Sequence, residues 1–329
     1  MSKPLPRVVI TERLDAACAD WLGGRAQVVW VDHTDTKAVA AALATADAAV
    51  VRTYTQVNPA FLAAGPNLKV VGRAGVGLDN FDLPACRAAG VRVVYTPDAN
   101  TQAVVEYVTG LMLDHVRPRT PLPAGADADT FHAMRKTEVG RQLNELTFGT
   151  LGFGRIGKRM GAVAHAIGMR VLACDVLPAE ALCAAVDYPV QLVDHATLYR
   201  EADVLTVHTD GRPANRGLVD AAALALLRPE VLLINAARGM LIDHPALIDW
   251  AKGRPDARAL LDVHDPEPPA PDAPLHDLPN VTLLPHLASR TGTALKNMSW
   301  VVRDVAAVLE GREPSHLAPE PPRDGDVNR

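Results

Sequence analysis

The stretch Gly152-Phe153-Gly154-Arg155-Ile156-Gly157 determines how the rest of this chain is interpreted. It follows a short strand-like run, Thr147–Leu151, and opens a segment whose apolar residues recur at steps of three and four, as on one face of a helix. A second apolar run, Arg170–Cys174, comes next and ends at Asp175. This order of strand, glycines, amphipathic helix, strand and acid predicts a βαβ unit whose turn binds a ligand.

Each glycine of the stretch has a physical role in binding a dinucleotide. Gly152 permits a tight turn, Gly154 lets the backbone approach a pyrophosphate, and Gly157 lets the helix pack close to the strand. At the helix start, around Arg155 and Ile156, free N–H groups and the helix dipole favour the charge of a phosphate. The stretch therefore predicts a nucleotide site.

Asp175 indicates which nucleotide binds. It lies 18 residues past Gly157, where an acidic side chain can accept hydrogen bonds from both ribose hydroxyls. A 2′-phosphate beside this carboxylate would be repelled, and neither Val176 nor Leu177 supplies a cation to offset the repulsion. NAD is therefore favoured over NADP.

The composition is that of an ordinary globular protein long enough for two domains. Of its 329 residues, 48% are hydrophobic and 22% charged, and the net charge of −5 argues against a surface that binds nucleic acid. The four cysteines form no CxxC pair, so no metal site is expected and a reducing compartment is indicated. No secretory leader and no membrane-spanning run is recognised, which together with the cysteines predicts a cytoplasmic location.

The order of elements predicts an α/β protein. Residues 7–98 alternate short β-rich runs with helical stretches but carry no nucleotide fingerprint, and the same rhythm resumes at Thr147. Residues 117–146 are irregular and suggest an arm or interface. One long helix from about Gly292 to Glu310 is expected to return to the first domain, and the Pro-rich residues 312–329 are expected to be mobile unless a partner holds them.

Three further places stand at the carboxyl ends of predicted strands, where ligands bind in open α/β sheets. They are Asn235-Ala236-Ala237-Arg238-Gly239, Asp262-Val263-His264-Asp265-Pro266-Glu267-Pro268 and Leu284-Pro285-His286.

With these motifs the chain resembles the D-isomer-specific 2-hydroxyacid dehydrogenases, and its phosphoglycerate-dehydrogenase-like branch most of all. The resemblance implies a Rossmann-type dinucleotide-binding domain (99–287) inserted in a smaller flavodoxin-like α/β substrate domain (1–98 and 288–329), with a cleft between them. The matching motifs, which span nearly the whole chain, are Gly72–Asn80, Asn100-Thr101-Gln102 with Glu106, Gly152–Gly157, Asn235–Gly239, Asp262-Val263 with Glu267-Pro268, and Pro285-His286.

The resemblance also implies a catalytic set of Arg238, Glu267 and His286. Arg238 offers a planar fork that can hold a carboxylate and polarise the C2 oxygen of a 2-hydroxy or 2-oxo acid. His286 can take the hydroxyl proton as hydride leaves C2 for the nicotinamide. Glu267, if hydrogen-bonded to the other ring nitrogen, would fix the tautomer and is expected to raise the pKa of His286.

The family pattern assigns the remaining roles. Val76 and Gly77 are expected to offer backbone N–H groups to the substrate carboxylate. Asp262 is expected to bind the nicotinamide amide, with Thr101 and Val104 as the surface against which the ring packs.

The substrate itself stays open at this point. Arg52, Arg73 and Arg135 could bind a distal phosphate, which would suit 3-phosphoglycerate, while hydroxypyruvate, glyoxylate or another small 2-oxo acid is the alternative. Residues 208–212 and 131–137 depart from the family pattern, which leaves the substrate in doubt but not the chemistry.

The sequence thus predicts an NAD-dependent oxidoreductase that interconverts a D-2-hydroxy acid and its 2-oxo acid. The alternative from another class is a non-catalytic, NAD-sensing protein similar to transcriptional corepressors that share this fold. A homodimer is implied by the resemblance, with residues 117–146 as its arm, and neither nucleic acid nor membrane is expected as a partner.

Overall fold

The structure, a computed structural model, describes residues 4–319. The chain divides into two compact units, one formed by Met1–Asn100 with Ser289–Arg329 and the other by Thr101–Ala288. From the sequence, the divisions were expected after residues 98 and 287. The two compact units are unit 1 and unit 2, in that order.

Unit 1 is a five-stranded parallel sheet in the order β2-β1-β3-β4-β5. Most of its helices begin at side chains that cap them; Asp35, Asn58 and Asp82, for example, each accept a hydrogen bond from a backbone N–H of the first turn. Its elements are β1 (Arg7–Ile10), α1 (Ala16–Gly23), β2 (Gln27–Trp30), α2 (Thr36–Leu43), β3 (Ala48–Val51), α3 (Pro59–Ala64), β4 (Val70–Arg73), α4 (Leu83–Ala88), β5 (Arg92–Tyr95), α12 (Gly292–Ser299) and α13 (Val302–Leu309).

The C-terminal segment does return to unit 1, but as two helices, so the expectation of one helix from about Gly292 to Glu310 is wrong. The Ser299 hydroxyl donates to the Leu295 carbonyl at 2.8 Å, a back-bond that bends helices. Past this point Val301, together with Val302 and Val305 of α13, is buried in a cluster that also contains Leu22 of α1.

The expectation that residues 312–329 are mobile is wrong for residues 312–319, and residues 320–329 lie outside the described part. Leu317 forms an antiparallel bridge with Val94 of β5, and the Ala318 N–H donates to the Val93 carbonyl at 2.8 Å. Glu313 pairs with Arg92 at 2.6 Å. Strand-like pairing and an ion pair therefore hold this segment against β5. The composition of the segment alone does not predict these contacts.

Unit 2 is a seven-stranded parallel sheet in the order β12-β11-β10-β9-β6-β7-β8. The strand order reverses between β6 and β9, which makes their carboxyl ends the expected ligand position. Its helices and strands are α5 (Thr101–Val116), α6 (Ala128–Thr137), β6 (Thr147–Leu151), α7 (Arg155–Ala166), β7 (Arg170–Cys174), α8 (Ala179–Cys183), β8 (Gln191–Leu192), α9 (His195–Glu201), β9 (Val204–Val207), α10 (Ala221–Leu226), β10 (Leu232–Asn235), α11 (His244–Lys252), β11 (Arg258–Leu261) and β12 (Val281–Leu283); short 3-10 helices cover Leu143–Glu145, Pro213–Asn215, Gly239–Leu241 and Pro274–Asp277.

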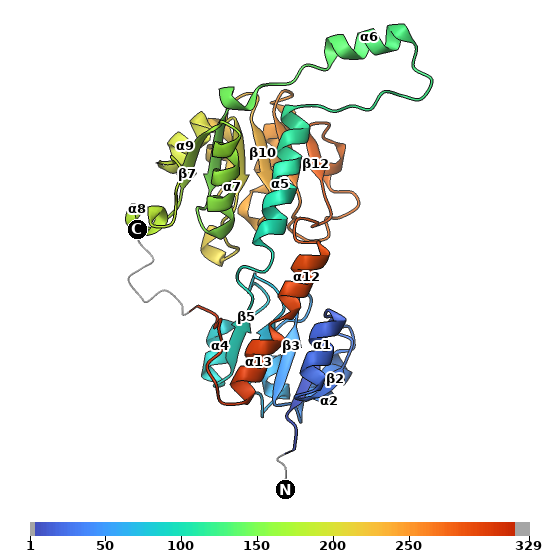
Figure 1. Cartoon of the computed structure of the whole chain (residues 1–329), viewed down its shortest axis with the longest axis vertical. Coiled ribbons are helices and arrows are strands. Elements are labelled where there is room, and N and C mark those ends of the chain that lie inside the picture. The colour runs from blue at the N-terminus through green and yellow to red at the C-terminus, as the bar shows by residue number, and fades with distance from the viewer. Residues whose placement is uncertain (1–3, 320–329) are drawn as a thin grey trace. The chain divides into compact units, whose positions relative to one another are not determined.

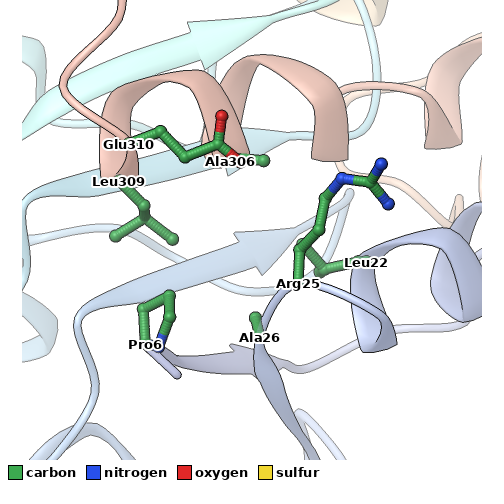
Figure 2. Close-up of a pocket in the computed structure, with 7 residues that line it drawn as sticks. All are labelled: Pro6, Leu22, Arg25, Ala26, Ala306, Leu309 and Glu310. Carbon is green, nitrogen blue, oxygen red and sulfur yellow. The ribbon is translucent and has the colours of Figure 1, made fainter. Parts of the chain in front are cut away.

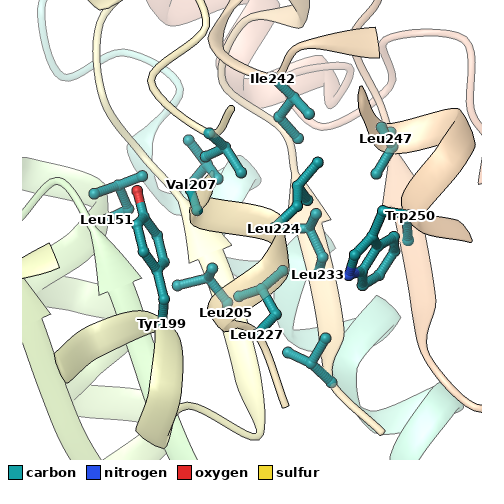
Figure 3. Packing of buried hydrophobic residues seen from close by; sticks show 14 of the residues in the cluster. Leu151, Tyr199, Leu205, Val207, Leu224, Leu227, Leu233, Ile242, Leu247 and Trp250 are labelled. Atoms are coloured by element: carbon teal, nitrogen blue, oxygen red, sulfur yellow. The ribbon is translucent and has the colours of Figure 1, made fainter. Parts of the chain in front are cut away.

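Both faces of this sheet are buried, because alternate strand residues point to opposite faces. Leu205 and Leu233 join the cluster under α9, α10 and α11 (Figure 3). Their neighbours Val204 and Leu232 join the cluster under α5 and α7. The predicted helix caps Asp220 and Asp243 are confirmed, since each accepts from a backbone N–H of the following helix. The helices packed on the two faces of the sheet hold its strands in place, and the residues of the candidate site follow the ends of these strands.

The irregular stretch 117–146 contains one helix, α6, that has no buried residue. Figure 1 shows α6 carried away from the sheet of unit 2 on two extended segments. None of its residues is therefore buried within this chain, and Arg135 is exposed. Among residues 4–319 no helix combines the length and apolar character needed to cross a membrane.

Candidate functional site

The glycine turn lies at the reversal point of the strand order, directly after β6. Gly152 has φ of +95°, and a Cβ there would come within 2.7 Å of the His208 backbone. A Cβ at Gly157 would lie 2.2 Å from the Gly152 carbonyl oxygen. Both positions therefore require glycine for the backbone itself, as the sequence pattern predicted for the turn and for close helix packing.

Gly154 differs, because no atom lies within 4 Å of a Cβ built there. It is the N-cap of α7 and offers no side-chain cap, and the first turn of this 12-residue helix carries no acidic residue. The N–H groups at the helix start, where Arg155 is exposed and Ile156 half-buried, are thus left without a capping side chain. The protein itself does not require glycine at this position, but a phosphate approaching the helix N-terminus would.

Asp175 reaches back to the glycine turn from the end of β7. Its Oδ2 accepts the Phe153 N–H at 2.7 Å, and its Oδ1 accepts the Leu177 N–H at 3.1 Å. A depression of about 260 Å³ opens beside it, bordered by Leu177, Val193 and Asp194 among others. The carboxylate is therefore half-buried next to open space, which fits a ribose with two free hydroxyls.

The segment after β9 packs against the same turn. The Thr209 hydroxyl donates to the Leu151 carbonyl at 3.1 Å, and the His208 N–H donates to the same oxygen at 2.7 Å. Both ring nitrogens of His208 are buried without a hydrogen-bond partner among residues 4–319. Burial lowers the pKa of His208 to about 3, so the ring is neutral at physiological pH.

Arg212 introduces a cation on this segment. Its Nε donates to Asp210 Oδ1 at 2.7 Å, and Asn215 donates to the same carboxylate oxygen at 3.0 Å. The hydrogen bond from Arg212 to Asp210 raises the pKa of Arg212 despite its partial burial, and the charge of Asp175 adds to the increase. Asp210 and Asp175 together outweigh the charge of Arg212, which favours a cofactor without a 2′-phosphate.

Glu267 and His286 come together in the structure. His286 Nδ1 lies 2.5 Å from Glu267 Oε1, although the residues follow different strands, β11 and β12. Burial raises the pKa of Glu267, but the hydrogen bond with His286 and the imidazole charge outweigh burial and hold it below its usual value. The side chains are 36% and 39% exposed, so a small ligand can reach them. With Nδ1 engaged, Nε2 is the ring nitrogen left for proton transfer.

Arg238 stands at the end of β10, the strand adjacent to β11. Its Nη1 donates to the Ala237 carbonyl at 2.6 Å, and the side chain is half-buried. The next residue, Gly239, presses on the segment after β11: a Cβ there would lie 2.0 Å from the His264 carbonyl carbon. Arg238 thus follows the strand next to that of Glu267, and the two loops are in backbone contact.

The three residues assigned to the nicotinamide are buried. Asp262 is 0% exposed and accepts the N–H groups of Leu287 and Ala288, both at 2.8 Å. Thr101 and Val104 are 1% and 4% exposed. In this conformation the geometry therefore supports a role in packing for all three.

The glycine-rich turn of unit 1 is held by Arg73. Its Nε donates to the Gly77 carbonyl at 3.0 Å and its Nη1 to the Ala74 carbonyl at 3.1 Å. The side chain is mostly buried, whereas Val76 and Gly77 are half-buried. Arg73 is thus placed to shape the turn that carries Val76 and Gly77 rather than to contact a ligand directly.

Arg52 follows β3 and is held in place by a carboxylate that the sequence reasoning missed. Glu12 accepts the backbone N–H groups of residues 52–55, four in all, and the Thr55 hydroxyl. Burial and the charge of Arg290 lower the pKa of Arg52. The charge of Arg290 therefore acts on Arg52 within unit 1, and the charge of Glu12 opposes it.

Glu12 and Tyr107, which donates to Asp262 at 3.3 Å, are the contributors that the sequence did not reveal. A weak signal existed for Glu12, an acid two residues after the apolar run Val8–Ile10. No signal existed for Tyr107, because its partner is 155 residues away.

Elsewhere the described residues offer little for a substrate or a metal. A cavity of about 90 Å³ in unit 1 is too small for a cofactor and contains none of the predicted site residues; it is lined by Pro6, Leu22, Arg25, Ala26, Ala306, Leu309 and Glu310 (Figure 2). No group of three or more His, Cys, Asp or Glu among residues 4–319 could hold a metal ion.

Comparisons with known proteins agree with this arrangement. Residues 109–288 match the family model described as "D-isomer specific 2-hydroxyacid dehydrogenase, NAD binding domain". The D-3-phosphoglycerate dehydrogenase of Mycobacterium leprae is 38% identical over 290 residues, 88% of this chain and 54% of that protein. The chain thus spans about half the length of this and similar relatives.

Two further proteins match along nearly their whole length. The hydroxypyruvate reductase of Thermotoga maritima is 31% identical over 295 residues, 89% of this chain and 94% of that protein. The crystal structure of the TT0316 protein from Thermus thermophilus has a TM-score of 0.81 at 30% identity and covers 95% of this chain and 100% of its own. The chain belongs to the family of D-isomer-specific 2-hydroxyacid dehydrogenases, and residues 109–288 match its NAD-binding domain.

Proposed function

We propose that the chain is an NAD-dependent dehydrogenase that interconverts a D-2-hydroxy acid and its 2-oxo acid. The observation that supports this most is the 2.5 Å contact of Glu267 with His286, on the sheet whose reversal point carries the glycine turn. An acid–imidazole pair that follows strands of the same parallel sheet as the nucleotide turn is suited to moving a proton while a hydride moves. Bound NAD would supply the hydride acceptor.

In the proposed mechanism His286 is the general base. Glu267 holds the proton of Nδ1, so Nε2 can accept the proton of the C2 hydroxyl when the acid is oxidised and return it in reduction. The imidazolium formed is stabilised by the ionised carboxylate of Glu267, whose pKa lies below its usual value. Arg238 holds the substrate carboxylate through its planar fork, which lysine could not do in a bidentate way.

The substrate we favour carries a second anionic group, as 3-phosphoglycerate does. Arg52 and Arg290 repel each other, and a dianion between or beside them would relieve that repulsion. Hydroxypyruvate or glyoxylate is the alternative, because a relative of nearly equal length is named a hydroxypyruvate reductase. Assays of phosphorylated and plain acids, followed by NADH absorbance, distinguish the two substrates.

His286→Asn tests the chemistry. Asparagine cannot act as a base near neutral pH, so kcat should fall by about 1000-fold. The affinity for NADH, measured by its fluorescence, should change by less than roughly twofold, because the glycine turn is intact. Undiminished turnover would rule out the proposed base, and if the unaltered protein binds NADH but turns over no acid in the panel, the NAD-sensing alternative is favoured.

We also propose a cytoplasmic homodimer whose arm is residues 117–146. The dimer is supported by α6, which buries none of its side chains within one chain. The cytoplasmic location is supported by the four free cysteines, of which three are buried. Light scattering after size-exclusion chromatography should give twice the mass of one chain, and deletion of α6 should give the single mass. A monomer at micromolar concentration before any deletion would contradict the dimer.

A further inference from the structure

Asp262 is a fully buried carboxylate of unit 2 that accepts three hydrogen bonds. It follows β11 and is 0% exposed. Its Oδ1 accepts the Leu287 N–H and its Oδ2 accepts the Ala288 N–H, both at 2.8 Å. The carboxylate therefore holds the two residues that directly follow His286.

A tyrosine from a distant helix completes the arrangement. The Tyr107 hydroxyl of α5 donates to Asp262 Oδ1 at 3.3 Å. Burial, together with the charge of Asp262 and the hydrogen bond to it, raises the pKa of Tyr107 to about 12. The hydroxyl is therefore protonated and remains a donor across the working pH range of an enzyme.

The backbone of His286 explains why this support matters. Among residues 4–319 it is the one non-glycine residue at positive φ, +55°. A side chain with a Cβ in this left-handed region costs roughly 1 kcal/mol and persists where the surroundings hold it. Two hydrogen bonds to a buried carboxylate, one and two residues later, supply that restraint.

The contacts of Asp262 also connect the two ends of unit 2. Ala288 is the last residue of the unit, and Tyr107 lies in the helix that begins at its first residue, Thr101. Ala288 also shares a buried cluster with Val104 and Val108 of α5. Asp262 thus ties the entering and the leaving segment of the unit to one buried charge.

We propose that Asp262 and Tyr107 are positioning residues that fix the imidazole of His286 by holding the backbone at Leu287 and Ala288. This rests on the proposed function, in which His286 is the general base. It assigns to Asp262 a role different from the nicotinamide contact that the family resemblance implies, since the carboxylate has no exposed surface here.

The test uses Asp262→Asn and Tyr107→Phe in the full chain. An amide at position 262 would turn a donor toward a backbone N–H, so the loop should shift and kcat should fall by about 100-fold. Tyr107→Phe removes one hydrogen bond and should lower kcat by roughly three- to tenfold. Both variants should change the ring ¹H–¹⁵N NMR signals of His286 and move the pH profile of kcat, while NADH affinity stays within roughly threefold.

Matched controls come from the same chain. Asp304→Asn alters another buried carboxylate that accepts a backbone N–H, from Ser315, in unit 1. Tyr199→Phe removes a buried hydroxyl that donates to the Leu218 carbonyl at 3.4 Å. Neither should change the His286 signals. His286→Asn identifies those signals by their loss.

The opposite pattern overturns the proposal. If Asp262→Asn weakens NADH binding more than roughly tenfold while the His286 signals stay unchanged, Asp262 acts on the cofactor. Should Asp262→Asn fail to fold, Tyr107→Phe decides, and unchanged signals and turnover would refute a positioning role. Undiminished turnover in His286→Asn would instead remove the proposed function, whatever the NMR signals show.

Discussion

Two turns of this molecule present backbone N–H groups at the carboxyl end of a parallel strand, and they differ in what fills them. In unit 1, the N–H groups of residues 52–55 converge on the carboxylate of Glu12. In unit 2, the start of α7 has no side-chain cap, and a side chain at Gly154 would meet nothing within 4 Å. The filled turn is part of the scaffold that holds Arg52, whereas the open turn is left for an external anion.

The largest effect should come from filling the open turn as Glu12 fills the closed one. Gly154→Asp places a carboxylate where a phosphate would sit, and like charges about 5 Å apart repel by about 3 kcal/mol. NADH affinity, measured by fluorescence titration, should fall by about 100-fold. The melting temperature should hold, because the added side chain has room.

Gly292→Asp is the matched control, since a Cβ at this helix start in unit 1 also meets nothing within 4 Å. It should leave NADH affinity unchanged. Equal affinity in Gly154→Asp would show that the open turn binds no phosphate.

Emptying the closed turn should have the next largest effect, on stability. Glu12→Gln weakens the acceptor for four N–H groups and should lower the free energy of unfolding by about 2 kcal/mol at pH 7. Burial raises the pKa of Glu12, but the four backbone hydrogen bonds outweigh burial and lower it from 4.5. Because this pKa is lower in the folded than in the unfolded state, the ionised carboxylate stabilises the fold at a pH above its unfolded pKa. The stabilisation is lost as the pH falls through its folded pKa.

Urea denaturation at neutral pH and below pH 4.5 checks this sign. The difference between Glu12→Gln and the unaltered protein should shrink on acidification. Glu310→Gln, at an exposed pair with Arg312, should change stability by less than roughly 0.5 kcal/mol. A pH-independent difference would contradict the role assigned to the Glu12 charge.

The smallest effect, on substrate preference, concerns Arg52 of the closed turn and its neighbour Arg290. If Arg52 and Arg290 serve a second anionic group, Arg290→Ala should lower kcat/KM for 3-phosphoglycerate by about tenfold. The value for hydroxypyruvate reduction should be unaffected, because that substrate lacks the second charge. Equal losses for both substrates would remove the preference for a dianion.

The open turn could be predicted from the sequence and the closed one could not. The glycines, the helix and Asp175 lie within one continuous stretch, so their spacing alone indicates how they meet. Glu12 and residues 52–55 meet only because β1 and β3 are neighbours in the sheet. The same holds for Tyr107 and Asp262, which are 155 residues apart.

Strand ends predicted one contact that the structure contains, since Glu267 and His286, which follow the adjacent strands β11 and β12, meet there. The features that the sequence did not predict depend on individual contacts. The last helix breaks after Ser299, whose hydroxyl bonds to the Leu295 carbonyl, and neither helical period nor propensity predicts such a bond. Arg73 looked like a ligand residue by type, yet the carbonyl of Gly77 engages it.

The pairing of Leu317 with Val94 has a consequence for any shortened form of this protein. β5 is the last strand of its sheet, and residues 316–318 occupy its outer hydrogen-bonding edge. A chain cut before this segment would present a bare row of strand amides and carbonyls, the feature through which folded proteins recruit one another into aggregates. Truncation at the C-terminal side therefore has to leave Ala318 in place.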